Sequence, residues 1–424
     1  MDRPGETRAR RLSASTSEFG RGWKVLGASF LGVMCGASPI PFNVLGTLFE
    51  PLQAEFGWNR GQVSAGITIF GITAALLAPV YGSMADRVGV RKVALWSLVA
   101  FALSFAALAL TPPSIYGFWA LWFVVGLVGI GSTPVTWSRA ISMWFVKQRG
   151  LALGLMLIGT SVAALFVPRL AVWSIENFGW REMFVIVALL PLLIALPVGL
   201  LFFREPRTDE LPPAIATGDG KVAGMTFAEA RRTKQFWILW ISILMIAFAY
   251  GGAHIHMFPI VRDHGFTPVT AAGIAGVVGL GIMVGRISVG FLLDRYWGPG
   301  VAFPALCLPA VACFMLMGTA QDIVLISAAA FMLGFAAGAE SDLIAYLASR
   351  YFGMAHFGRI YGMLYMPFGL ASAVSPLAYG VVRDRTGSYD PMLLVAAGLF
   401  VVGGAILLLM GRYPEAEARK AALA

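Results

Sequence analysis

The segment from residue 82 to residue 92 has the sequence GSMADRVGVRK and separates two long apolar runs. Its distinctive residues are Gly82, Asp86, Arg87, Gly89, Arg91 and Lys92. A glycine such as Gly82 lets two helices approach closely, and the carboxylate of Asp86 can face the positive end of a neighbouring helix. Positive charges beside an apolar run hold that side of a membrane protein in the cytoplasm. The segment is therefore typical of a short cytoplasmic loop between two membrane-spanning helices.

The composition indicates that the whole chain is a membrane protein. Of its 424 residues, 58% are hydrophobic and 12% are charged, and the mean hydropathy is +0.78. A soluble protein would carry roughly 25% charged residues. These values exclude a disordered chain, a disulfide scaffold and an ordinary cytosolic enzyme. The apolar runs also exceed the roughly 10-residue alternating strands of an outer-membrane barrel, so we predict helical spans.

Twelve apolar runs are long enough to form membrane helices, each of which needs about 20 residues. The predicted spans cover residues 24–51, 61–85, 92–111, 116–145, 151–175, 182–203, 235–260, 268–293, 301–320, 323–349, 358–382 and 391–411. The predicted fold class is therefore an all-α membrane protein with twelve transmembrane helices.

The formal net charge of +9 includes 31 lysines and arginines, which lie mainly in the gaps between spans and form no continuous face. We therefore predict no nucleic-acid partner. With the amino terminus inside, 23 of these cations fall in inner segments, five in outer loops and three within spans. This asymmetry predicts a multi-pass protein of the inner (plasma) membrane with both chain ends in the cytoplasm. The first apolar run is too long for a signal-peptide core and is predicted to be a span.

Several landmarks of the first half recur in the second half at a constant offset of 208 residues. The matching pairs are Pro51 and Pro259, Gly57 and Gly265, Gly82 and Gly290, Asp86 and Asp294, Arg87 and Arg295, Gly150 and Gly358, Gly154 and Gly362, Pro168 and Pro376, and Gly179 and Gly387. These matches indicate that the second six spans repeat the first six in parallel. Such a repeat is typical of transporters that rock one half of the molecule against the other.

The repeat and the polar stretches divide the chain into five predicted parts. These are a basic cytoplasmic tail (1–23), a six-helix bundle (24–203), a cytoplasmic linker (204–234), a second six-helix bundle (235–411) and a cytoplasmic tail (412–424). Within the linker, Thr226 and Glu229 have the spacing of a capping box. They predict a short helix just before the seventh span.

The loop segment at residues 82–92 resembles the signature of the major facilitator superfamily in the spacing of its glycines, its Asp-Arg pair and its basic pair. Further fragments resemble the monocarboxylate porter and oxalate/formate antiporter branches, namely residues 57–60, 144–154, 179–181, 351–353 and 358–362. The resemblance covers nearly all of the chain. It implies two six-helix bundles that alternate access as a monomer without a cofactor. The signature would gate the cytoplasmic side, although its second copy, with Asp294 and Arg295, lacks the trailing glycine and basic pair.

Arg286 lies within the predicted eighth span, where a charged group is costly unless it faces a cavity. A guanidinium group can bind a carboxylate through two parallel hydrogen bonds. In the resembled branches an arginine in this span binds the substrate carboxylate, which implies the same role here. The alternative is a structural partner for a buried acid. The porters carry an aspartate where this chain has Ile282, and the span-eleven lysine of the oxalate type is absent, which favours a monoanion over a dianion.

Glu340 and Asp342 lie near the middle of the predicted tenth span. A carboxyl group that is removed from water favours its protonated form, which suits a proton carrier. Residues two positions apart point about 200° apart on a helix, so the two acids should have different roles. We predict that one carries a proton and the other pairs with Arg139 or Arg286. A purely structural ion pair is the alternative.

Other candidates for a binding cavity come from spans one, seven and eleven, namely Asn43, Tyr250, Tyr361 and Tyr365. His254 and His256 fail as a metal site because residues two apart on a helix face away from each other, so we predict no metal. The chain carries no hydrolase elbow, zinc-protease helix or phosphate-binding loop. We predict that the protein is not an enzyme and that an ion gradient or exchange supplies its energy.

The sequence thus predicts a secondary active transporter of a small organic anion, a monocarboxylate, which crosses the bilayer together with a proton. Arg286 would hold the carboxylate, and an acid of span ten would hold the proton. One alternative is a proton-coupled exporter of cationic or drug-like compounds, in which Glu340 or Asp342 attracts the substrate. Another is a membrane sensor on the same fold that transports nothing.

Overall fold

The computed structural model describes residues 18–207, 210, 223–318 and 322–414. Within these residues the regular secondary structure is helical, apart from one isolated bridge between Gly224 and Gly353. The predicted tails 1–23 and 412–424 and the predicted linker 204–234 lie partly outside the described residues. The first described helix, α2, begins at Glu18, inside the predicted tail.

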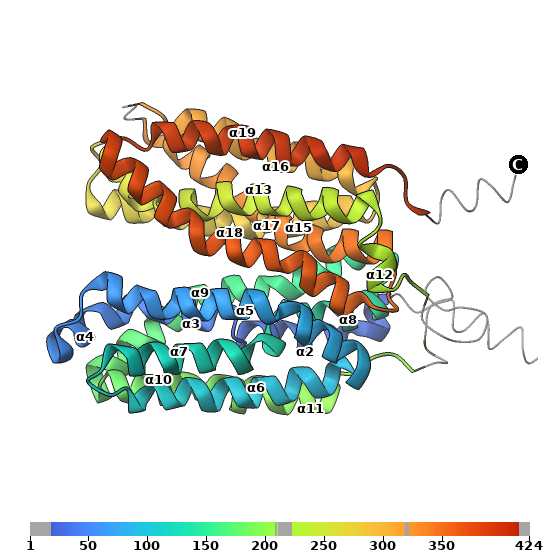
Figure 1. Ribbon diagram of the computed structural model, residues 1–424, viewed down its shortest axis with the longest axis horizontal. Helices are drawn as coiled ribbons and strands as arrows, with labels where there is room; N and C mark the ends of the chain where they lie inside the picture. Colours follow the sequence, from blue (N-terminus) through green and yellow to red (C-terminus); the bar gives the residue numbers. More distant parts are fainter. Residues whose placement is uncertain (1–17, 208–209, 211–222, 319–321, 415–424) are drawn as a thin grey trace, which may run out of the picture.

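The helices of the first half form one group in space, and those of the second half form another (Figure 1). The first group contains α2 (Glu18–Met34), α3 (Ile40–Leu45), η1 (Gly46–Leu48), α4 (Phe49–Phe56), α5 (Arg60–Val88), α6 (Val90–Ala106), η2 (Ala107–Leu110), α7 (Ile115–Gly129), η3 (Ile130–Ser132), α8 (Pro134–Trp144), α9 (Arg149–Phe178), α10 (Trp180–Leu190), η4 (Pro191–Ala195) and α11 (Leu196–Phe202). The second group contains α13 (Lys234–Ile255), α14 (Met257–Asp263), α15 (Pro268–Leu293), α16 (Gly298–Leu316), α17 (Ile323–Phe352), α18 (Phe357–Thr386), α19 (Asp390–Leu407) and η5 (Leu408–Met410).

Eleven helical segments of the described residues are long and apolar enough to cross a membrane. The prediction of an all-helical membrane fold is confirmed, and the count approximates the twelve predicted spans. The first predicted span, 24–51, is not one helix. It is interrupted after α2, which has 17 residues and ends at Met34, and it resumes as the shorter α3, η1 and α4.

The first span is interrupted where its backbone closely contacts the backbone near Ser132. A Cβ atom on Gly36 would lie 2.3 Å from the carbonyl oxygen of Ser132, and the Ser132 hydroxyl accepts a hydrogen bond from the N–H of Ala37 at 3.0 Å. Ser132 itself lies at a second interruption, between α7 and α8, where Pro134 starts the new helix. The two interrupted helices therefore contact each other at their interruptions. A hydropathy average over many residues does not resolve either interruption.

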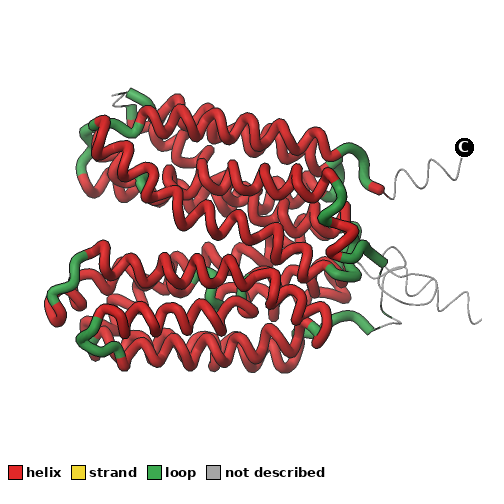
Figure 2. Tube along the Cα trace, viewed as in Figure 1, coloured by secondary structure: helices red, strands yellow, loops and turns green. Residues whose placement is uncertain are grey.

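The short helix α12 (Phe227–Ala230) follows the linker and confirms the predicted capping box. The Thr226 hydroxyl accepts from the N–H of Glu229 at 3.2 Å, and the Glu229 carboxylate accepts from the N–H of Thr226 at 2.7 Å. We call the end of the molecule that carries α12 the linker end. The tube view shows the two groups meeting at this end (Figure 2). Helix α5 packs on α18, and α9 packs on α15.

Candidate functional site

The carboxylate of Asp86, near the end of α5, binds the first turn of α18 in the other group. Its oxygens accept from the N–H groups of Gly358 and Arg359, each at 2.9 Å. The residue before α18, His356, provides no side-chain cap of its own. Asp86 therefore caps this helix from outside, where its negative charge also faces the positive end of the helix dipole.

Asp294, directly after α15, makes the corresponding contact in the opposite direction. Its oxygens accept from the N–H of Gly150 at 2.7 Å and of Leu151 at 3.0 Å, in the first turn of α9. Burial raises the pKa of the Asp294 carboxyl to about 6, although the N–H groups of Leu151 and Gly150 favour its charged form. Since 208 residues separate Asp86 from Asp294 and Gly150 from Gly358, the two caps are copies of one arrangement.

Glycines bring the backbones of the two groups into direct contact beside each cap. A Cβ atom on Gly82 would lie 1.9 Å from the carbonyl oxygen of Gly358, and one on Gly290 would lie 2.7 Å from that of Gly150. These contacts follow the same 208-residue repeat. The linker end is therefore closed by two glycine pairs and two carboxylate caps, each of which joins the first group to the second.

The remaining signature residues lie close to these contacts in the sequence. Gly89 ends α5 with a φ of 97°, in the region that favours glycine. Arg91 donates to the carbonyl oxygen of Leu200 at 2.5 Å, and the guanidinium of Arg295 lies 3.7 Å from the centre of the Phe291 ring. Arg87 and Lys92 are exposed.

Arg139 of α8 also belongs to this end of the molecule. It forms salt bridges with Asp86 and with Glu205, the latter at 3.0 Å, and it donates to the carbonyl oxygen of Met354 at 3.3 Å. It therefore binds neither acid of α17 through these contacts. Of the two arginines that we considered as partners for an acid of α17, only Arg286 is left.

Arg286 is buried and reaches from α15 into the other group. One of its terminal nitrogens, Nη1, donates to the carbonyl oxygen of Leu157, to Thr160 Oγ1 at 2.6 Å and to Ser161 Oγ at 3.5 Å. All three acceptors belong to α9. The Nε atom of Arg286 is buried and has no hydrogen-bond partner among the described residues. The guanidinium group thus keeps unused donor capacity inside the molecule.

The two acids of α17 are also buried and incompletely bonded. Within the part of the chain that the structure describes, both carboxylate oxygens of Asp342 and one of Glu340 lack a hydrogen-bond partner. Asp342 interacts electrostatically with Arg286, and a Cβ atom on Gly154 would lie 3.1 Å from its Oδ2 atom. Glu340 interacts instead with Tyr250 and Tyr365. Buried polar groups without partners are rare in proteins, so the cluster has the chemistry of a ligand site.

Three of the predicted cavity residues gather around this cluster. Tyr250 and Tyr365 interact electrostatically with Arg286 as well as with Glu340, and Tyr361 interacts with Asp342. The rings of Tyr361 and Tyr365 have their centres 6.0 Å apart on α18.

The side-chain amide of Asn43, the fourth predicted cavity residue, donates to the carbonyl oxygen of Pro39 at 2.7 Å. His256 bonds to Tyr389 and to the carbonyl oxygen of Pro376, each at 3.0 Å. Sequence reasoning missed Thr160 and Ser161, which face Arg286. Their only signal was two adjacent hydroxyl residues in a predominantly apolar span.

Comparison with known proteins identifies the family. The family model of the Major Facilitator Superfamily matches residues 26–376, so the chain belongs to this superfamily of membrane transporters. The chain is 24% identical over 410 residues to rat monocarboxylate transporter 13, which covers 93% of this chain and 90% of the relative. It is 25% identical over 410 residues to the hexuronate transporter of Escherichia coli K12, and the alignment covers 91% of this chain and 93% of that transporter.

The solved structures agree on the fold. The fucose:proton symporter of E. coli superposes with a TM-score of 0.70 at 14% identity, over 94% of this chain and 100% of the symporter. The predicted resemblance to the superfamily is confirmed, and monocarboxylate transporters are among the relatives.

Proposed function

We propose that the protein is a secondary active transporter that moves a small organic monoanion, a monocarboxylate, together with a proton. The observation that carries the proposal is the buried guanidinium of Arg286, which interacts electrostatically with Asp342. Its Nε atom and both carboxylate oxygens of Asp342 have no hydrogen-bond partner among the described residues. The names of the rat and E. coli relatives, a monocarboxylate transporter and a hexuronate transporter, also favour a carboxylate substrate.

In this proposal the substrate carboxylate and Asp342 compete for Arg286. Without substrate, the negative charge of Asp342 balances the guanidinium. When Asp342 takes up a proton from solution, Arg286 is released to bind the substrate carboxylate through two N–H donors. One proton then accompanies one monoanion, and the site has the same net charge with and without its cargo. A site whose charge is balanced costs less to carry through the membrane than a charged one.

Glu340 has a different role in the proposal. It interacts with Tyr250 and Tyr365 but is not among the groups that interact with Arg286. We propose that Glu340 and these two tyrosines determine the shape and polarity of the substrate site. Asp342 is then the proton carrier, because its protonation directly changes how firmly Arg286 is held.

Alternating access would use the contacts at the linker end. The caps of Asp86 and Asp294 and the glycine pairs hold the two groups together there. Opening of this end requires all four contacts to separate, while the opposite end closes. From the asymmetry of the lysines and arginines we propose that the linker end faces the cytoplasm of a cell whose inner (plasma) membrane holds the protein as a monomer.

Asp342→Asn is expected to abolish proton-driven accumulation of the substrate in proteoliposomes while substrate exchange across the membrane continues. An asparagine cannot bind the proton, but it leaves Arg286 free for the carboxylate. The measurement compares uptake at pH 6 and pH 7.5 with counterflow at each pH. Glu340→Gln is the matched control on the same helix and should keep the pH dependence. If Asp342→Asn keeps it and Glu340→Gln loses it, the assignment of the proton is wrong.

The substrate class is tested by thermal stability of the purified protein with monocarboxylates, dicarboxylates and lipophilic cations at pH 6 and pH 7.5. Stabilisation by monocarboxylates that is stronger at pH 6 supports the proposal.

The second candidate function, export of cationic compounds, is favoured by one observation, since two acids accompany one arginine in the cluster. Stabilisation by lipophilic cations alone would favour that candidate.

A further inference from the structure

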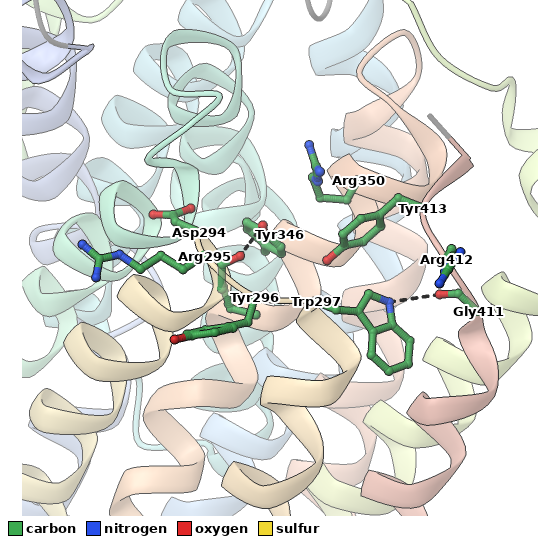
Figure 3. Close-up of a pocket in the computed structure, with 10 residues that line it drawn as sticks. Asp294, Arg295, Tyr296, Trp297, Tyr346, Arg350, Gly411, Arg412 and Tyr413 are labelled. Carbon is green, nitrogen blue, oxygen red and sulfur yellow. Dashed lines mark hydrogen bonds between the residues drawn. The ribbon is translucent and has the colours of Figure 1, made fainter. Parts of the chain in front are cut away.

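A cavity of about 650 Å³ opens at the linker end of the second group, apart from the Arg286 cluster. Three segments form its walls, namely the end of α15 with the loop to α16, the last turns of α17, and the residues that follow η5 (Figure 3). Helix α15 ends at Leu293, and the apolar span of this helix ends at the same residue. The cavity therefore lies at the boundary between the hydrocarbon core of a membrane and its lipid headgroups.

The cavity has an excess of positive charge. Each of the three segments contributes one arginine, namely Arg295, Arg350 and Arg412. Among the described residues that line the cavity, Asp294 is the only acid, and its two carboxylate oxygens are both bonded to backbone N–H groups of α9. The carboxylate of Asp294 is therefore bonded to another helix, and the described lining carries three arginines against this one acid.

Hydrogen bonds fix the wall that follows η5 against its neighbours. Trp297 Nε1 and the hydroxyl of Tyr351 donate to the carbonyl oxygen of Gly411 at 3.1 and 2.6 Å. The hydroxyl of Tyr413 accepts from the N–H of Gly298 at 2.8 Å. The guanidinium of Arg350 lies 4.6 Å from the centre of the Tyr413 ring. This stacking orients the arginine side chain. The cavity is therefore a built site with defined walls.

The rim of the cavity is aromatic and exposed. Tyr296 and Trp297, which line it, are 63% and 36% exposed, and the neighbouring Phe291 is 41% exposed. Arg295 lies over the Phe291 ring. Aromatic rings and arginines are enriched together at the boundary between hydrocarbon and headgroups. A ligand that occupies this cavity can therefore place a polar group among the arginines and an apolar part along the rim.

We propose that this cavity binds a phosphate group, carried by an anionic phospholipid of the leaflet at the linker end. Guanidinium groups match phosphate oxygens with pairs of hydrogen bonds, and basic pockets beside membrane helices bind anionic headgroups. The exposed aromatic rim supplies contacts for the acyl chains that inorganic phosphate would not use. The proposal does not depend on which substrate is transported.

The test uses the full-length protein in a phosphate-free detergent solution and measures its unfolding temperature. Added phosphatidylglycerol is expected to raise this temperature by several degrees relative to phosphatidylcholine, because ligands that bind only the folded protein stabilise it. The double variant Arg295→Gln/Arg412→Gln should lose this difference. The matched control Arg231→Gln/Arg232→Gln removes two exposed charges at the same end, outside the cavity lining, and should keep it.

Inorganic phosphate separates the two sources of the phosphate group. If millimolar phosphate gives the same stabilisation with the same dependence on Arg295 and Arg412, the phosphate chemistry is supported and the ligand is a soluble anion. The proposal is overturned if phosphatidylglycerol and phosphatidylcholine act alike on the wild type, or if the double variant keeps the difference. The unfolding temperature in phosphatidylcholine shows directly whether the double variant is folded.

Discussion

Arg286→Gln is expected to abolish transport of the monocarboxylate while the protein still folds and inserts. Removal of one partner from a buried, hydrogen-bonded charge pair costs roughly 2–5 kcal/mol. Since about 1.4 kcal/mol corresponds to a factor of ten, substrate binding should weaken by at least about 30-fold. The measurement is uptake and counterflow of the monocarboxylate in proteoliposomes that contain equal amounts of folded protein.

Two further variants sharpen this prediction. Arg286→Lys keeps the charge but loses the planar pair of donors, so its uptake should lie between wild type and Arg286→Gln. Arg169→Gln removes an exposed arginine of α9 that bonds to the carbonyl oxygen of Leu165 in its own helix, and it should transport like wild type. Unchanged uptake in Arg286→Gln would show that the guanidinium does not bind the substrate.

Gly82→Ala is expected to open the linker end and to slow transport by about 5-fold or more. The added methyl carbon would lie 1.9 Å from the carbonyl oxygen of Gly358, a backbone atom that cannot move without α18. Overpacking of this kind costs about 1–3 kcal/mol. That cost falls only on the conformation in which α5 and α18 touch, so the population of this conformation falls by about 5- to 150-fold relative to the open one.

The measurement for Gly82→Ala combines uptake with the distance between spin labels at two exposed positions, Lys147 in the first group and Arg232 beside the second. We expect a longer distance and slower uptake than in wild type. Gly71→Ala is the matched control, because Gly71 lies in the same helix and a Cβ atom there would have no heavy atom within 4 Å. If both variants show the wild-type distance, the glycine contact does not hold the linker end closed.

Hydropathy and the 208-residue repeat predict much of the fold from the sequence alone. Each span is defined by its own residues, so most of its bounds follow from local composition. The first span is the exception. Gly36, Pro39 and Pro41 are visible signals of a break, but a hydropathy window averages over them. The contact that stabilises the break comes from Ser132, about 95 residues away in the chain.

The site could be predicted only in part, for geometric reasons. The repeat relates Asp86 to Asp294 and Gly150 to Gly358, but it does not say that Asp86 meets Gly358, since this contact crosses between the two halves. Helix geometry separates Glu340 from Asp342 without indicating which one faces Arg286. That choice depends on how α17 is rotated against α15 and α9, and the packing of three helices determines this rotation.

The most direct test of the central claim measures proton movement in proteoliposomes that contain a pH-sensitive dye. Addition of a transported monocarboxylate outside wild-type proteoliposomes should acidify their interior as the labelled substrate enters, whereas Arg286→Gln proteoliposomes should show neither change. Entry of substrate through the wild-type protein without acidification would contradict proton-coupled transport of the monoanion. Equal acidification by Arg286→Gln would contradict the role of Arg286.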